Sequence, residues 1–223
     1  MTNDAHACFN LLLSSAKSGR IREALAHYRS ASDAWHALAQ SDRSLNHGLK
    51  AHSSLIERGM HWLQQPGCHL IAWHQQDYPE SLRHVASPPA FLFVRGRKEL
   101  LWHRQIGIVG SRQPSASGKE CAHYFARRLA ASGFTVTSGL ARGIDAAAHL
   151  GAMSAGQTIA ALATGPDMAF PSCNQDLYER IAETGALITE HPPGVPALRS
   201  HFPARNRLIA GLSQGTLVIE AAI

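Results

Sequence analysis

The chain has 223 residues and a mass of 24.1 kDa, which suits one domain of ordinary size together with a smaller one. Hydrophobic residues make up 45% of the chain and charged residues 17%, so a sizeable core is possible and wholesale disorder is excluded. The 21 Lys and Arg residues exceed the 16 Asp and Glu residues, giving a net charge of +5. This surplus fits an anionic partner but is too small to establish one.

The four cysteines, Cys8, Cys68, Cys121 and Cys173, are at least 52 residues apart, which excludes CxxC pairs and a dense disulfide framework. We therefore expect a reducing, cytoplasmic compartment. No basic residue precedes the first apolar stretch, CFNLLL, and no apolar run approaches the ~18 residues of a membrane helix, so we expect neither export nor a membrane partner. The 14 histidines are scattered without a ligand motif, so we expect no metal site and no cofactor.

Residues 1–65 carry apolar side chains at helical spacing, with Ile21, Ala24, Leu25 and Tyr28 on one face, and predict a small N-terminal helical domain. Residues 66–100 contain several prolines and one short apolar run, and we expect a linker with a short strand. Residues 101–223 alternate apolar runs, glycine turns and helical segments. That alternation predicts an α/β fold with a mostly parallel sheet and helices on both faces.

Five short runs are the expected strands of this sheet. They are QIGIVG (105–110), FTVTSG (134–139), TIAALATG (158–165), ALITEH (186–191) and TLVIEAA (216–222). The last run lies at the end of the chain, with no helix to follow it. We therefore expect a fragment of a larger fold whose remaining strands follow Ile223, with a minimal five-strand sheet as the alternative.

Glycine and small polar residues follow the first two strands, where ligands of doubly wound sheets bind. Gly110, Ser111 and Arg112 end the first strand, and they suit either a phosphate clamp or a tight turn with a solvated arginine. The second loop, SGLARGID (138–145), repeats this chemistry. Its Asp145 is expected to cap backbone amides rather than to act as an acid or base.

The segment 199–207 places three arginines and one phenylalanine within nine residues that contain no acid. A helix starting near Pro203 would direct Arg205 and Asn206 toward the strand ends. An aromatic side chain among cations is the means by which proteins grip single-stranded nucleic acid. The alternatives are a solvated basic face and, for Phe202, a hydrophobic staple at the start of the helix.

Charge is unevenly distributed among these segments. Residues 96–150 carry a net charge of +5 and residues 199–207 a net charge of +3, whereas residues 151–198 carry −4. We therefore expect the positive charge to gather on the loops that face a ligand.

Taken together, the runs PPAFLFVRG, IGIVGSRQPSASG, TSGLARGIDAAAH, ALITEHPPG, FPARNRLIAGLS and TLVIEA closely resemble the DNA-processing protein A family (DprA, also called Smf) over about residues 70–222. The resemblance implies an extended Rossmann-like domain, preceded by a helical domain similar to a sterile alpha motif. It implies a homodimer without catalytic activity that binds and protects incoming single-stranded DNA. It also implies loading of the RecA recombinase during natural transformation.

The resemblance also assigns residues. The family's phosphate-binding GSR motif falls on Gly110, Ser111 and Arg112. Further phosphate contacts are implied at Ser138, Gly139, Gly143, Arg199, Arg205, Asn206 and Arg207, and base stacking at Phe202. Three features depart from the family. Phe170 stands where tyrosine is frequent, and the helical domain is only weakly recognisable in residues 1–65. We also expect these residues to omit the further sheet and the winged-helix-like domain that the resemblance implies after the VIEA strand.

An enzyme is the rival interpretation. The run SQGTLVIE partly matches the GGxGTxxE signature of nucleoside-monophosphate phosphoribohydrolases, with Gln214 in place of one glycine and Glu220 one position late. A scaffold that binds only proteins is a third possibility.

Overall fold

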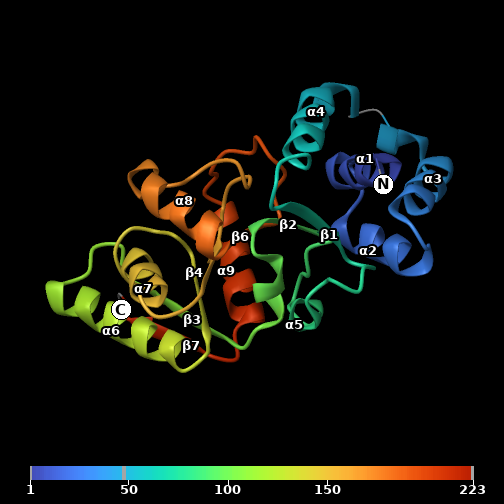
Figure 1. The fold of residues 1–223 in the computed structure, drawn as a ribbon. Helices are drawn as coiled ribbons and strands as arrows, with labels where there is room; N and C mark the ends of the chain where they lie inside the picture. Colours follow the sequence, from blue (N-terminus) through green and yellow to red (C-terminus); the bar gives the residue numbers. More distant parts are fainter. Residues whose placement is uncertain (1, 47–48, 222–223) are drawn as a thin grey trace.

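The structure is a computed structural model that describes residues 2–46 and 49–221. Its first part is helical, as the apolar spacing predicts, and the helices pack against one end of the sheet (Figure 1). The Ser30 hydroxyl caps one of them by accepting a hydrogen bond from the Asp33 amide (3.1 Å). These helical elements are α1 (Thr2–Leu13), α2 (Ser18–His27), α3 (Ala31–Ser41), the short 3₁₀ segments Arg43–Asn46 and Leu49–His52, and α4 (Ser53–Trp62).

The expectation of a linker over residues 66–100 is wrong. This segment supplies β1 (Cys68–Ala72), β2 (Phe91–Gly96), the short helix α5 (Glu80–Arg83) and a 3₁₀ turn (Lys98–Trp102). The run FLFV is apolar throughout because β2 is buried on both faces, as is typical of an inner strand. Pro66 precedes β1 and the other prolines lie in the connection between β1 and β2, so they do not interrupt either strand.

The remaining strands form the predicted parallel block. They are β3 (Gln105–Gly110), β4 (Thr135–Ser138), β5 (Thr158–Ala161), β6 (Ala186–Thr189) and β7 (Thr216–Ile219). The sheet has the order β1-β2-β6-β5-β4-β3-β7, with β1 and β2 antiparallel to their neighbours and every other neighbouring pair parallel. The fold is thus the mostly parallel α/β arrangement that the sequence predicts.

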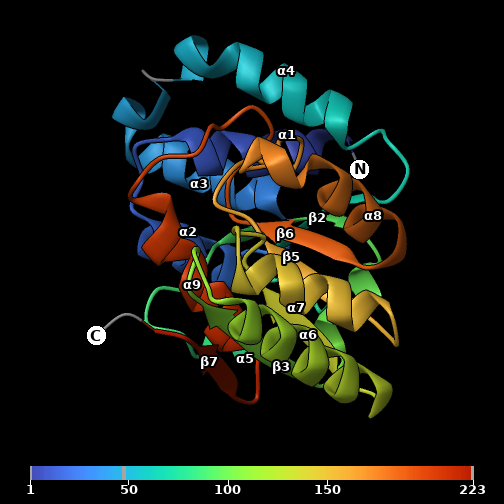
Figure 2. The ribbon, with the colours of Figure 1, turned by 90° about the vertical axis from the view of Figure 1, so that its left-hand side faces the viewer.

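Helices cover both faces of this sheet (Figure 2). On β5, Ile159 and Ala161 pack with α9 (His201–Leu212) and α5, whereas Ala160 packs on the opposite face with α8 (Gln175–Thr184). Helices α6 (Ala116–Ala131) and α7 (Ile144–Met153) continue that opposite face over β3 and β4. None of the helices in residues 2–46 and 49–221 combines the length and apolar character needed to cross a bilayer.

Strand order reverses at β3. The chain proceeds from β3 through β4 and β5 to β6 in one direction, and α9 then returns it to β7 on the other side of β3. Ligands of such sheets bind outside the carboxyl ends of the strands at this reversal. Here the strands approach so closely that a Cβ atom at Gly110 would collide with the Ile219 carbonyl, so only glycine fits.

A buried histidine supports this end of the sheet. His149 on α7 is fully buried, its Nε2 accepts a hydrogen bond from the Leu140 amide (3.3 Å), and its Nδ1 lies 2.7 Å from the Thr158 hydroxyl. Because that hydroxyl donates to the Val136 carbonyl, it accepts from Nδ1, which fixes the tautomer. Burial and the charge of Arg205 lower the pKa of His149 to about 3.

We expect the ring of His149 to stay neutral down to about pH 4, because its pKa in the folded chain is about 3. Histidine ring resonances followed by NMR from pH 8 to pH 4 would check this. The unfolded chain takes up a proton at His149 below about pH 6.5, but the folded chain does not. Stability is therefore lost as the pH falls, by roughly 1.4 kcal/mol per pH unit. A midpoint near 6.5 for His149 would contradict the buried geometry.

Candidate functional site

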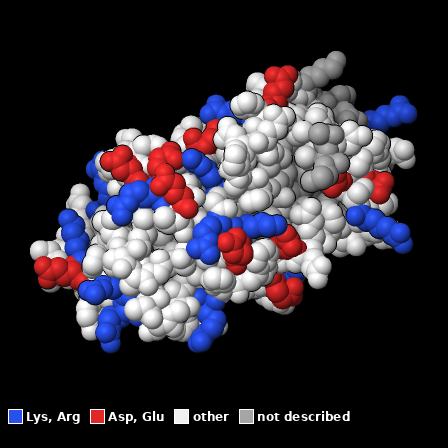
Figure 3. Space-filling view, in the orientation of Figure 1, with Lys and Arg blue, Asp and Glu red and all other residues white. Residues whose placement is uncertain are grey.

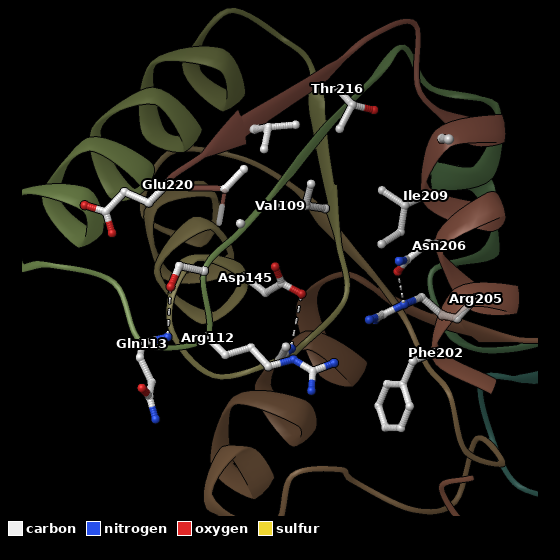
Figure 4. A pocket seen from close by; sticks show the side chains of 16 residues that line it. Val109, Arg112, Gln113, Asp145, Phe202, Arg205, Asn206, Ile209, Thr216 and Glu220 are labelled. Atoms are coloured by element: carbon white, nitrogen blue, oxygen red, sulfur yellow. Dashed lines mark hydrogen bonds between the residues drawn. The ribbon is translucent and has the colours of Figure 1, made fainter. Parts of the chain in front are cut away.

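A groove lies at the carboxyl ends of β3, β4 and β7, where the strand order reverses (Figure 4). It consists of a larger chamber of about 840 Å³ and a smaller chamber of about 410 Å³. The two chambers share Arg112, Ala141, Phe202 and Arg205 in their walls. We call the whole the strand-end groove.

The β3 loop forms one wall of the larger chamber. Its shape depends on Ser111, whose carbonyl accepts a hydrogen bond from the Ile144 amide (3.1 Å) and whose hydroxyl accepts one from the Gln113 amide (3.1 Å). Gly143 has a positive φ of 82°, and a Cβ there would collide with the Ser111 carbonyl. The β3 and β4 loops are thus locked together, and Arg112 is left exposed between them.

Arg112 and Phe202 meet inside the groove. The guanidinium carbon lies 5.3 Å from the centre of the Phe202 ring, at a distance typical of a cation–π contact. The Phe202 ring also contacts Phe170, with 5.7 Å between ring centroids and 55° between ring planes. The groove therefore carries an aromatic pair. The site predicted from the sequence includes only Phe202 of this pair. The aromatic residue Phe170 in the third loop, next to Pro171, could have indicated the second ring.

Arg205 is placed at the strand ends, as predicted, but it is buried. Its Nη1 donates to the carbonyls of Gly139 and Ala161 (2.8 Å for the latter), and its Nε donates to the Asn206 side chain (3.0 Å). A Cβ at Gly139 would collide with this guanidinium. The geometry makes Arg205 a support that joins α9 to β4 and β5, with one edge reaching both chambers.

Asp145 lies beneath the same loop and is buried. Its carboxylate accepts hydrogen bonds from the amides of Gly139 (3.1 Å) and Ala141 (3.3 Å), which agrees with the expected capping role. Burial raises the pKa of Asp145, and the Arg205 charge opposes that shift. Since these loop amides are bound internally, they are not available to a phosphate.

The other predicted phosphate ligands separate into three groups. Asn206 lines the larger chamber and Gly139 lines the smaller one. Ser138 is buried, with its hydroxyl bound to the Ile108 carbonyl (2.6 Å), and Arg207 pairs with Glu190 on the far side of α9 (2.5 Å). Arg199 is exposed ahead of α9 but lines neither chamber. Ser138 and Arg207 are thus committed elsewhere in this structure.

Glu220, on which the enzyme interpretation depends, follows β7. Its carboxylate accepts hydrogen bonds from the Ser115 amide (2.9 Å) and hydroxyl at the start of α6, and these bonds lower the pKa of Glu220. Figure 4 shows it pointing away from Phe202 and Arg205. This is the geometry of a helix cap.

Positive charge is less focused than we expected. Of the eight basic residues in 96–150, only Arg112 and Arg142 line the groove. Figure 3 shows basic and acidic side chains interleaved over much of the face seen there. Within the described residues, no three His, Cys, Asp or Glu side chains gather as a metal ion would require.

We expect Arg205→Ala to destabilise the fold by about 3 kcal/mol, because it removes charged hydrogen bonds and leaves buried carbonyls and Asp145 without their partner. Arg112→Ala, at an exposed position, should change stability little. Urea unfolding of both variants checks this contrast. Equal stabilities would show that Arg205 does not support the fold.

Comparison with known proteins agrees with this architecture. The model of the family described as DNA recombination-mediator protein A matches residues 69–223. Protein Smf of Escherichia coli is 42% identical over 188 residues, covering 83% of this chain and 49% of that protein. The DNA processing protein DprA of Bacillus subtilis is 38% identical, covering 70% of this chain and 54% of that one. The chain thus spans about half the length of the curated relatives it matches.

Solved structures resemble the fold as well. DprA from Streptococcus pneumoniae has a TM-score of 0.78 at 28% identity, covering 98% of this chain and 78% of that chain. DNA processing protein A from Helicobacter pylori, whose structure concerns its single-stranded DNA binding mode, has a TM-score of 0.64 at 27% identity, covering 70% and 71%. By sequence and by fold, this chain belongs to the DNA recombination-mediator protein A family, DprA/Smf.

Proposed function

We propose that the strand-end groove binds single-stranded DNA, with a base stacked on Phe202 and a phosphate held by Arg112. The observation that carries the proposal is the Arg112–Phe202 pair inside a groove at the strand reversal. A ring and a cation side by side suit a nucleotide, which offers a π-face and a negative charge. The H. pylori relative, which binds single-stranded DNA, supports the same conclusion.

The contact between Arg112 and Phe202 has a consequence for binding. In the structure, the Arg112 guanidinium lies over the Phe202 ring. A base that stacks there replaces the guanidinium, which becomes available to the adjacent phosphate. The site therefore exchanges a cation–π contact for a base stack and a charged hydrogen bond.

We expect Phe202→Ala to weaken binding of labelled oligothymidine by roughly 5- to 150-fold, equivalent to ~1–3 kcal/mol for one lost base stack. Arg112→Ala should weaken binding and also reduce the slope of log K against log [salt] by about 0.7, because one phosphate contact is lost. Fluorescence anisotropy over a salt series measures both.

Tyr28→Ala and Arg29→Ala, at exposed positions in the helical part, are matched controls. Unchanged affinity in both groove variants would refute the assignment.

We further propose that the complete protein acts as the family name indicates, as a recombination mediator and not as an enzyme. In this proposal it works in the cytoplasm as a homodimer, protects incoming single strands and helps load RecA. Family membership supports this role, and the capping geometry of Glu220 gives no support to the rival phosphoribohydrolase.

Light scattering is the first test of the homodimer. We expect the 223-residue chain to have a mass of about twice 24.1 kDa in solution. A mass that stays at 24.1 kDa at every concentration would contradict dimerisation by this part of the chain.

A further inference from the structure

The smaller chamber of the groove has its own chemical character. Phe170 leaves 47% of its surface exposed there, beside Pro171 and Arg142. A large aromatic side chain exposed in a concave site points to a ligand more than an isolated surface residue does. Neither Phe170 nor Arg142 has a part in the contacts proposed above.

The loop that carries Phe170 is held in place by the surrounding structure. The Thr164 hydroxyl donates to the Met168 carbonyl (2.7 Å), and the Asp167 carboxylate accepts from the Gly194 amide (2.9 Å) and from Arg58 of α4 (2.7 Å). A ring on such a loop loses little conformational freedom when a ligand stacks on it. Phe170 is therefore suited to binding, beyond being exposed.

Arg142 also lines the smaller chamber, on a loop that is held in place. The Asn174 side chain donates to the carbonyls of Leu140 (2.9 Å) and Ala141 (3.3 Å), which joins the β4 loop to the segment before α8. The Arg142 Nε donates to the Cys173 thiol (3.1 Å), a weak and uncharged acceptor. Within the described residues, Arg142 forms no ion pair with a carboxylate, in contrast to Arg58, which pairs with Asp167. Its charge is free to bind a phosphate.

We propose that the smaller chamber is a second nucleotide subsite, in which Phe170 stacks the base next to the one on Phe202 and Arg142 binds its phosphate. The inference rests on the proposed single-stranded DNA binding and extends it from one nucleotide to two. The 5.7 Å between the two ring centroids places the stacking surfaces side by side. The four side chains thus place two aromatic rings and two arginines along one groove.

Cys173 offers a direct test of occupancy. It is an exposed free thiol at the rim of the smaller chamber, next to the lining residue Ser172 and hydrogen-bonded to Arg142. Cys8 and Cys68 are buried, and Cys121 lies half-buried on α6. We expect saturating oligothymidine to slow alkylation of Cys173 by N-ethylmaleimide at least several-fold while Cys121 reacts unchanged. Peptide mass spectrometry measures both rates in one sample.

Affinity measurements on variants complete the test. Phe170→Ala should weaken oligothymidine binding roughly 5- to 150-fold without changing the salt slope, and Arg142→Ala should lower the slope by about 0.7. The same variants at Tyr28 and Arg29 are the controls. If Phe202→Ala impairs binding but Cys173 stays unprotected, or Phe170→Ala matches its control, the second subsite is refuted and the proposed function stands. If wild-type protein binds no oligothymidine, both fail.

Discussion

The hydrogen bonds from Arg205 to the carbonyls of Gly139 and Ala161 determine the shape of the groove. One cation on α9 joins the ends of two neighbouring strands, so the helix is fixed in both position and rotation. Phe202 lies almost one turn before Arg205 on the same helix face, and its ring is therefore directed into the groove. Asp145 balances part of the buried charge and shapes the β4 loop through its own amide bonds. Stability and ligand geometry thus depend on the same buried group.

Helical phase explains why the two arginines of α9, Arg205 and Arg207, have different surroundings. Phe202, Arg205 and Asn206 are spaced i, i+3 and i+4 and share the face toward the groove, whereas Arg207 lies on the side of Glu190. A helical-wheel argument on the sequence could have separated Arg207 from the others. The burial of Arg205 could not have been obtained this way, because it depends on two strand ends that are distant in sequence.

The parallel strands were predictable because each is a short apolar run, and β3 and β4 also end in glycine or a small polar residue before a helix, a local pattern. The place of β1 and β2 was not, since β1 joins the sheet only through β2, and the antiparallel pairing of β2 with β6 joins segments about 100 residues apart. The motif positions Gly110, Ser111, Arg112 and Phe202 meet at one groove as predicted, and their functional roles stay proposals. Ser138 looked like a loop residue but completes the hydrogen bonding of the sheet.

The ion pair between Arg58 and Asp167 connects the N-terminal helical region to the loop that carries Phe170. Arg58 belongs to the helical region, whereas Asp167 lies three residues before Phe170. The helical region therefore acts as an external brace for one rim of the groove. A substitution on the surface of α4, far from the proposed nucleotide site, can therefore alter how firmly that rim of the groove is held.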